Sequence, residues 1–95
     1  MMTKDEYVRR MHSKLDHWNA EIDKLAAKAS QSRAEVGAEY HRQVEELRSK
    51  RDEAKSSLER LQNAGEGAWE DMKAGLEMAW AAIGEAIDSA KSRFR

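Results

Sequence analysis

The sequence predicts an all-α protein, with a long helix over about residues 3–63 and a returning helix over about 67–94. The two would pack antiparallel as a helical hairpin of the coiled-coil type. Apolar residues recur three and four apart, as on one face of a helix, and no proline interrupts them. The charged fraction of 37% and the mean hydropathy of −0.93 suit narrow helix–helix seams rather than a deep core.

The first helix has a clear start. Thr3 is followed three residues later by Glu6, the spacing of a capping box, in which the hydroxyl accepts a hydrogen bond from an unpaired backbone amide. Asp5 and Glu6 also place negative charge at the positive end of the helix dipole. The helix is therefore expected to begin at residue 3 or 4.

The apolar stripe of this helix runs from Val8 to Leu61. Its first part repeats every seven residues, and the repeat then takes one step of eight, from Val36 to Val44. A straight helix drifts by about 20° per heptad, and the longer step restores the phase. The pattern therefore favours one continuous helix, about 90 Å long at 1.5 Å per residue.

The end of the long helix is marked by Asn63-Ala64-Gly65-Glu66-Gly67. Asn and Gly tolerate the left-handed conformation that closes helices. Glu70 and Asp71 then suit the start of a new helix, and Lys91 and Arg93 suit its end.

An alternative is a three-helix, spectrin-like bundle with a break near residues 30–37. The stretch Ser30-Gln31-Ser32-Arg33 has weak helical propensity, and Gly37 follows it. The stretch holds no Pro, Asn or Gly-Gly signal, and helical propensity resumes at Ala34. The continuous helix is therefore preferred, with the bundle as the alternative.

The chain is expected to form a single helical domain over residues 1–95, in which 36–95 make the antiparallel hairpin. Folding about Gly65 would place Trp69 near Leu61 and Ile83 near Leu47. The predicted hairpin core consists of the seam residues of both helices: Val36, Tyr40, Val44, Leu47, Leu58, Leu61, Trp69, Met72, Leu76, Trp80, Ile83, Ile87 and Phe94.

Residues 3–35 would then lack a partner within the chain and act as an oligomerisation arm. Burying a large apolar side chain contributes about 1.5–3 kcal/mol, so the arm would be buried by a second copy. The expected assembly is a homo-oligomer, with a dimer favoured, and an unidentified protein partner is the alternative. The predicted oligomer interface consists of Val8, Met11, Leu15, Trp18, Ile22 and Leu25.

Each histidine has a carboxylate four residues later, which lies beside it on a helix. Such a pair can ligate a transition metal, and it can equally be a surface hydrogen bond. The candidate metal ligands are His12, Asp16, His17, Glu21, His41 and Glu45. The surface interpretation is preferred, so no metal, cofactor or catalytic residue is assigned and the chain is not expected to be an enzyme.

Charge and hydropathy bear on partners and location. The net charge is −1 without a basic patch, which argues against nucleic acid as a partner. No stretch approaches 18 uninterrupted apolar residues, as a membrane span requires, and the start lacks the apolar run of a signal peptide. A cytoplasmic protein is expected. An amphipathic, peripheral lipid-binding role is an alternative that the acidic polar face of the last helix disfavours.

Three segments resemble a group of small bacterial coiled-coil proteins of unassigned function: Tyr7-x-x-x-Met11-x-x-x-Leu15-x-x-Trp18-Asn19-Ala20-Glu21-Ile22-Asp23-Lys24-Leu25, Glu45-Glu46-Leu47-Arg48-x-Lys50-Arg51-Asp52-Glu53-Ala54 and Ala68-Trp69-Glu70-Asp71-Met72-Lys73-Ala74-Gly75-Leu76-Glu77-x-Ala79-Trp80. The resemblance covers nearly the whole chain and implies a helical, bacterial, cytosolic protein. It transfers no activity. The expected function is that of a non-enzymatic, self-associating structural or interaction protein, with a metal- or ligand-binding helical bundle as the alternative.

Overall fold

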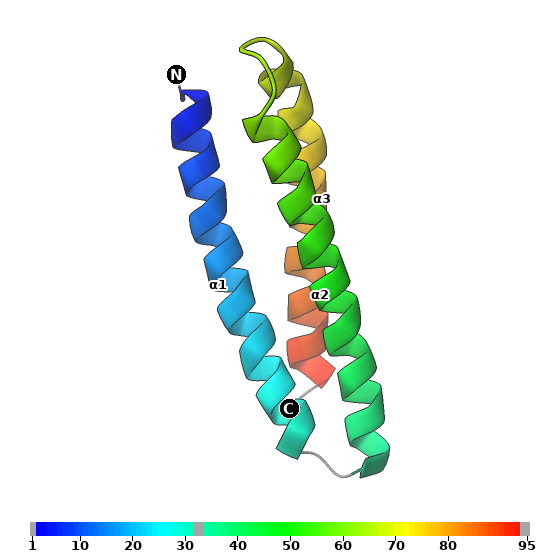
Figure 1. The fold of residues 1–95 in the computed structure, drawn as a ribbon. Helices are drawn as coiled ribbons and strands as arrows, with labels where there is room; N and C mark the ends of the chain where they lie inside the picture. Colours follow the sequence, from blue (N-terminus) through cyan, green and yellow to red (C-terminus); the bar gives the residue numbers. More distant parts are fainter. Residues whose placement is uncertain (1, 32–33, 94–95) are drawn as a thin grey trace.

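The computed structural model describes residues 2–31 and 34–93, and side chains from residue 37 onward in the second part. These residues form three helices and no strand: α1 (Lys4–Gln31), α2 (Ala34–Gln62) and α3 (Ala68–Arg93). The helices lie side by side, with α1 and α3 running in the same direction and α2 in the opposite one (Figure 1). The bundle is a rod of 50 × 18 × 16 Å.

The preferred prediction of one helix over residues 3–63 is wrong, and the alternative three-helix bundle is confirmed. The continuous helix would be about 90 Å long, whereas the longest dimension of the structure is 50 Å. The chain reverses between Gln31 and Ala34, within the range where the alternative placed its break.

The reversal has a simple energetic reason. The apolar stripe of α1 is worth on the order of 10 kcal/mol when buried, and folding back buries it at once against the chain's own helices. Interrupting a helix costs only a few backbone hydrogen bonds, each worth about 1 kcal/mol net. Ser30 weakens the end of α1 further, because its hydroxyl donates to the Ala26 carbonyl oxygen at 3.2 Å, a bond that competes with regular helix.

The predicted start of α1 is confirmed. The helix begins at Lys4, and the Glu6 amide donates to the Thr3 hydroxyl at 3.2 Å. The Lys4 ammonium reaches across to the Ala64 carbonyl oxygen at 3.0 Å, so it ties the first turn to the loop between α2 and α3.

The predicted break at residues 63–67 is also confirmed, because α2 ends at Gln62 and α3 begins at Ala68. The expected left-handed closure does not occur, since no described residue has a positive φ. The helix instead tightens into a last short turn, in which the Ala64 amide donates to the Leu61 carbonyl at 3.1 Å. Such three-residue bonds are common at helix ends.

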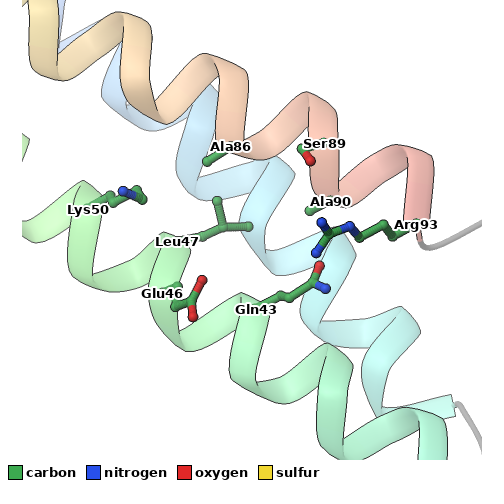
Figure 2. Close-up of a pocket in the computed structure, with 8 residues that line it drawn as sticks. All are labelled: Gln43, Glu46, Leu47, Lys50, Ala86, Ser89, Ala90 and Arg93. Carbon is green, nitrogen blue, oxygen red and sulfur yellow. The ribbon is translucent and has the colours of Figure 1, made fainter.

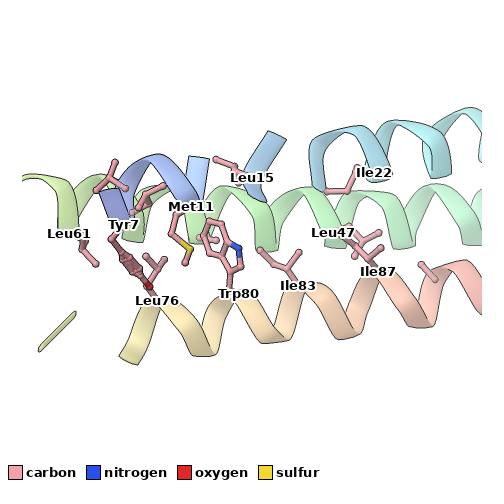
Figure 3. Close-up of a cluster of buried hydrophobic side chains, with 14 of the residues drawn as sticks. Tyr7, Met11, Leu15, Ile22, Leu47, Leu61, Leu76, Trp80, Ile83 and Ile87 are labelled. Carbon is pink, nitrogen blue, oxygen red and sulfur yellow. The ribbon is translucent and has the colours of Figure 1, made fainter. Parts of the chain in front are cut away.

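The core runs along the middle of the rod and draws on all three helices (Figure 3). Of the six residues predicted to form an oligomer interface, Trp18 is half-buried. The other five are buried inside the chain: Val8, Met11, Leu15, Ile22 and Leu25. The prediction of an unpartnered arm over 3–35 and a separate hairpin over 36–95 is therefore corrected, since α1 packs against α2 and α3 of its own chain.

Most of the predicted hairpin core is buried. Tyr40 and Met72 are half-buried, and Val36 and Phe94 lie outside the described side chains. The buried members are Val44, Leu47, Leu58, Leu61, Trp69, Leu76, Trp80, Ile83 and Ile87. The register of α2 against α3 differs from the predicted one by about one helical turn. Leu47 was expected near Ile83, and it lies beside Ala86 and Ala90.

No helix in the described part of the chain combines the length and the apolar character that crossing a membrane requires.

Candidate interaction surface

The side of the bundle formed by α1 and α3 is the least closed. α2 packs closely against both other helices, whereas α1 and α3 contact each other much less. A groove of about 340 Å³ lies between them. Its walls carry Met11, Lys14 and Trp18 from α1 and Glu77, Trp80, Ala81 and Gly84 from α3.

Trp18 and Trp80 form the floor of this groove. Their ring centroids lie 4.9 Å apart and the planes are inclined at 45°, a tilted arrangement that aromatic pairs favour. Trp80 is buried, and it points into the core near Met11 and Ile83 (Figure 3). Trp18 is only half-buried, so part of a large aromatic surface remains in contact with water.

Gly84 allows Trp18 to lie close to α3. A Cβ atom at this position would stand 3.9 Å from Cζ2 of Trp18, which is ordinary van der Waals contact. A larger side chain would fill the space that the indole ring occupies. The small residue therefore shapes the groove.

The indole nitrogen of Trp80 is unusual. Nε1 is buried and has no hydrogen-bond partner among the described residues. Buried donors are nearly always paired, and an unpaired one costs about 1–3 kcal/mol.

A second hollow, of about 420 Å³, adjoins the outer side of Trp18. It is lined by Arg10, Ser13, Lys14 and His17 together with Trp18. Lys14 and Trp18 line both hollows, so the two form one continuous surface around the half-buried ring. We call it the Trp18 surface.

The two edges of the Trp18 surface differ in charge. Helical spacing of three, four and seven residues places Arg10, Lys14, His17 and Lys24 on one exposed edge of α1, which we call the basic ridge. The matching edge of α3 carries four exposed carboxylates, which we call the acidic ridge: Glu70, Glu77, Glu85 and Asp88. Lys73 and Lys91 lie beside them at the same helical spacing, and Lys91 pairs with Glu21 of α1.

Glu21 interrupts the basic ridge, and two lysines pair with it. Its Oε2 lies 2.7 Å from Nζ of Lys91 on α3, and its Oε1 lies 3.7 Å from Nζ of Lys24. The Lys91 hydrogen bond holds the pKa of the Glu21 carboxyl below its ordinary value, and the same bond raises the pKa of Lys91. This pair joins α1 to α3 near the far end of the rod.

Tyr7 joins the same two helices at the other end. Its hydroxyl donates to Oε1 of Glu77 at 3.4 Å, and its ring lies 5.8 Å from that of Trp69. The Lys73 ammonium lies over both rings, at 5.2 Å and 5.7 Å. Burial and then the neighbouring Glu77 raise the pKa of Tyr7 to about 12.

Met78 stands out on the exposed side of α3. Its side chain is 75% exposed, more than any other large hydrophobic residue of the described part of the chain. Ala74, Ala81 and Ala82 lie three or four residues from it and are also exposed. Together they extend the apolar part of the Trp18 surface outward between the acidic side chains.

A hollow between α2 and α3 is a weaker candidate (Figure 2). Leu47, Ala86 and Ala90 form its apolar part, and Gln43 and Arg93 point toward each other at its end. Its volume is about 120 Å³, whereas ligand pockets generally measure about 300–1,000 Å³. It has room for a few water molecules.

The predicted metal-ligand pairs lie apart from one another, and Glu21 is held by Lys91 and Lys24. His12 and His17 are exposed on α1 and His41 on α2. Within the described ranges, no three His, Asp or Glu side chains are grouped so that they could hold a metal ion.

Arg51, a half-buried charged residue of α2, has partners within the chain. Nη1 donates to Oδ1 of Asn19 on α1 at 3.1 Å, and the guanidinium also pairs with Asp52 at 2.9 Å. Arg51 therefore helps to hold α1 against α2.

Comparison with family models, with curated proteins and with solved structures finds no significant match for this chain.

The sequence indicated Trp18 as an interface residue but did not indicate its setting. The charged residues of both ridges recur at helical spacing in the sequence. The sequence does not show that the two ridges flank one groove, because that depends on α1 lying beside α3.

Proposed function

We propose that this chain is a non-enzymatic helical module that self-associates through the Trp18 surface. The observation that carries the proposal is the half-buried Trp18 in an open groove, beside an exposed Met78. Half-exposed tryptophan is a frequent anchor residue of protein interfaces. Five of the six stripe residues that were first expected to drive association are buried inside the bundle, and the sixth, Trp18, keeps part of its ring exposed and is the anchor of the proposed surface.

The shape of the bundle supports a binding role more than a catalytic one. The described side chains lie along straight helices, and the hollows are shallow surfaces between or beside them. A docking surface needs apolar area with a charged rim, and the Trp18 surface has both.

Sedimentation equilibrium of the full chain tests this function. The chain concentration is varied upward from about 1 μM, a range in which a dimer of moderate affinity forms. The proposal expects a dimer whose formation buries Trp18 and shifts its emission to shorter wavelength. Trp18→Ala is expected to weaken association while helicity by circular dichroism is kept. Leu58→Ala is a matched control, because Leu58 is a core residue with 0% exposure. It should lower the free energy of unfolding without changing association of the folded chain.

A monomer at every concentration would overturn the proposal. The same protein preparation also tests the two alternatives from the sequence, metal binding and lipid binding. Elemental analysis should find no stoichiometric metal, and the chain should not sediment with anionic vesicles.

A further inference from the structure

The distribution of charge around the groove indicates the relative orientation of two associated copies. The basic ridge lies along α1 and the acidic ridge along α3, on the two sides of the same groove. A surface with opposite charges on its two edges can be complementary to itself. A second copy of the chain is therefore the occupant with the matching pattern.

We infer that two copies dock face to face in parallel, with α1 of each against α3 of the other. This inference rests on the proposed self-association and adds its orientation and its charged partners. The interface is isologous, so each contact occurs twice about a two-fold axis.

The direction follows from the fold. α1 and α3 of one chain run the same way (Figure 1). A two-fold axis parallel to the rod places α1 opposite α3 of the second copy, so the basic ridge meets the acidic ridge. A two-fold axis across the rod would place α1 opposite α1 and α3 opposite α3. Like charges would then face each other, and their repulsion disfavours that arrangement.

The levels of the charges along the rod agree with the parallel arrangement. The hydrogen bond from Tyr7 to Glu77 and the contact of Trp18 with Gly84 show which parts of α1 and α3 lie at the same height. On this scale Arg10 lies near the height of Glu77, and Lys14 lies between the heights of Glu77 and Glu85. A parallel dimer without a shift along the axis therefore brings opposite charges to the same level.

The apolar parts meet in the same arrangement. Met78 and Ala81 of one copy face the hollow beside Trp18 of the other, which is lined by Arg10, Ser13 and Lys14. A side of the rod 50 Å long and 18 Å wide offers enough area for the roughly 800 Å² per partner that a stable interface buries.

Charge reversal tests the inference. One variant reverses part of the basic ridge (Arg10→Glu with Lys14→Glu), and a second reverses part of the acidic ridge (Glu77→Lys with Glu85→Lys). Each is expected to raise the dimer dissociation constant at least about tenfold. Lys55→Glu with Arg60→Glu on α2 changes the net charge as the first variant does, and it should leave association unchanged. Circular dichroism confirms that each chain is folded.

A chain that carries all four ridge substitutions distinguishes the orientations. Its α1 is acidic and its α3 basic along the groove, so the parallel arrangement predicts that it dimerises with itself again. The same arrangement predicts that it does not mix with the wild type, as measured by energy transfer between labelled chains. Mixing of the two would show that α1 faces α1 and would overturn the inferred orientation.

Two outcomes separate the inferred orientation from the proposed self-association. If the wild type dimerises and the ridge reversals leave the dissociation constant unchanged, this inference is wrong and the proposed self-association stands. If the wild type stays monomeric, both are wrong.

Discussion

The rings of Trp18 and Trp80 lie 4.9 Å apart, and they join α1 to α3 across the most open side of the bundle. One ring is buried and the other is half in water. The pair therefore contributes to the core and to the surface at once. Its environment depends on Gly84, which leaves room for the exposed ring.

Gly84→Ala should raise the free energy of unfolding by up to about 1 kcal/mol, because glycine is a poor helix former. The added Cβ would meet Trp18 at 3.9 Å, without a clash. Gly75→Ala is the matched control, since nothing lies within 4 Å of its Cβ position. Urea unfolding measures both. Gly84→Leu, by contrast, should displace the ring and shift tryptophan emission to longer wavelength. A Gly84→Ala variant less stable than the wild type would contradict the described packing.

Ile22→Glu should destabilise the whole bundle by about 4 kcal/mol or more, because it places an unpaired charge in the core. Ile22 is 0% exposed. Ala20→Glu introduces the same side chain at an exposed position of the same helix and should change the free energy of unfolding by less than about 0.5 kcal/mol. Urea unfolding followed by circular dichroism compares them. If Ile22→Glu left the rest of the chain fully stable, α1 would not belong to the common core.

The Glu21–Lys91 pair should make stability sensitive to acid. The pKa of Glu21 is lowered in the folded chain from its ordinary 4.5. Its contribution is therefore present above that value and is lost as the pH falls through the folded pKa. Glu21→Gln should be less stable than the wild type at neutral pH, and the difference should vanish in acid.

Urea unfolding at several pH values measures the difference for Glu21→Gln. Glu53→Gln, an exposed position on α2, is the control for removing one negative charge. A difference that grew toward acid pH would contradict the pairing.

Tyr7 should ionise only in strong alkali. Burial and the nearby Glu77 raise its pKa to about 12 from 10.0. The folded state therefore resists ionisation, and its stability should fall as the pH rises from the ordinary value through the folded one. An absorbance titration of tyrosinate should show a component near pH 12 that Tyr7→Phe removes. An unchanged titration in Tyr7→Phe would show that the hydroxyl is not held as described.

Much of the fold could be predicted from the sequence, because helix ends and apolar faces are local properties. The start of α1 after Thr3 and the loop at 63–67 follow from residue types alone, and most of the predicted hairpin-core residues are buried. The reversal after Gln31 could not be decided in this way. The step from Val36 to Val44 lies wholly within α2, so its phase carries no information on whether the chain breaks before Val36.

The candidate surface depends on contacts that no local pattern shows. Trp18 was recognised as an apolar seam residue, and it is one. Its contacts with Trp80 and Gly84, and its position between two ridges of opposite charge, depend on the packing of α1 against α3. The sequence does not show that packing. The register of α2 against α3 was also misjudged by about one turn, because the conformation of the loop sets it.

The central claim, that α1 folds back onto its own chain, can be tested by one distance. The chain has no cysteine, so Arg9→Cys with Glu59→Cys provides two unique spin-label sites on exposed positions of α1 and α2. Dipolar spectroscopy, with labelled chains diluted in excess unlabelled chain, reports the distance within one molecule. The bundle predicts neighbouring helices about 10 Å apart between axes, so the labels should be close. A distance near the roughly 75 Å of a continuous helix between these positions would contradict the account.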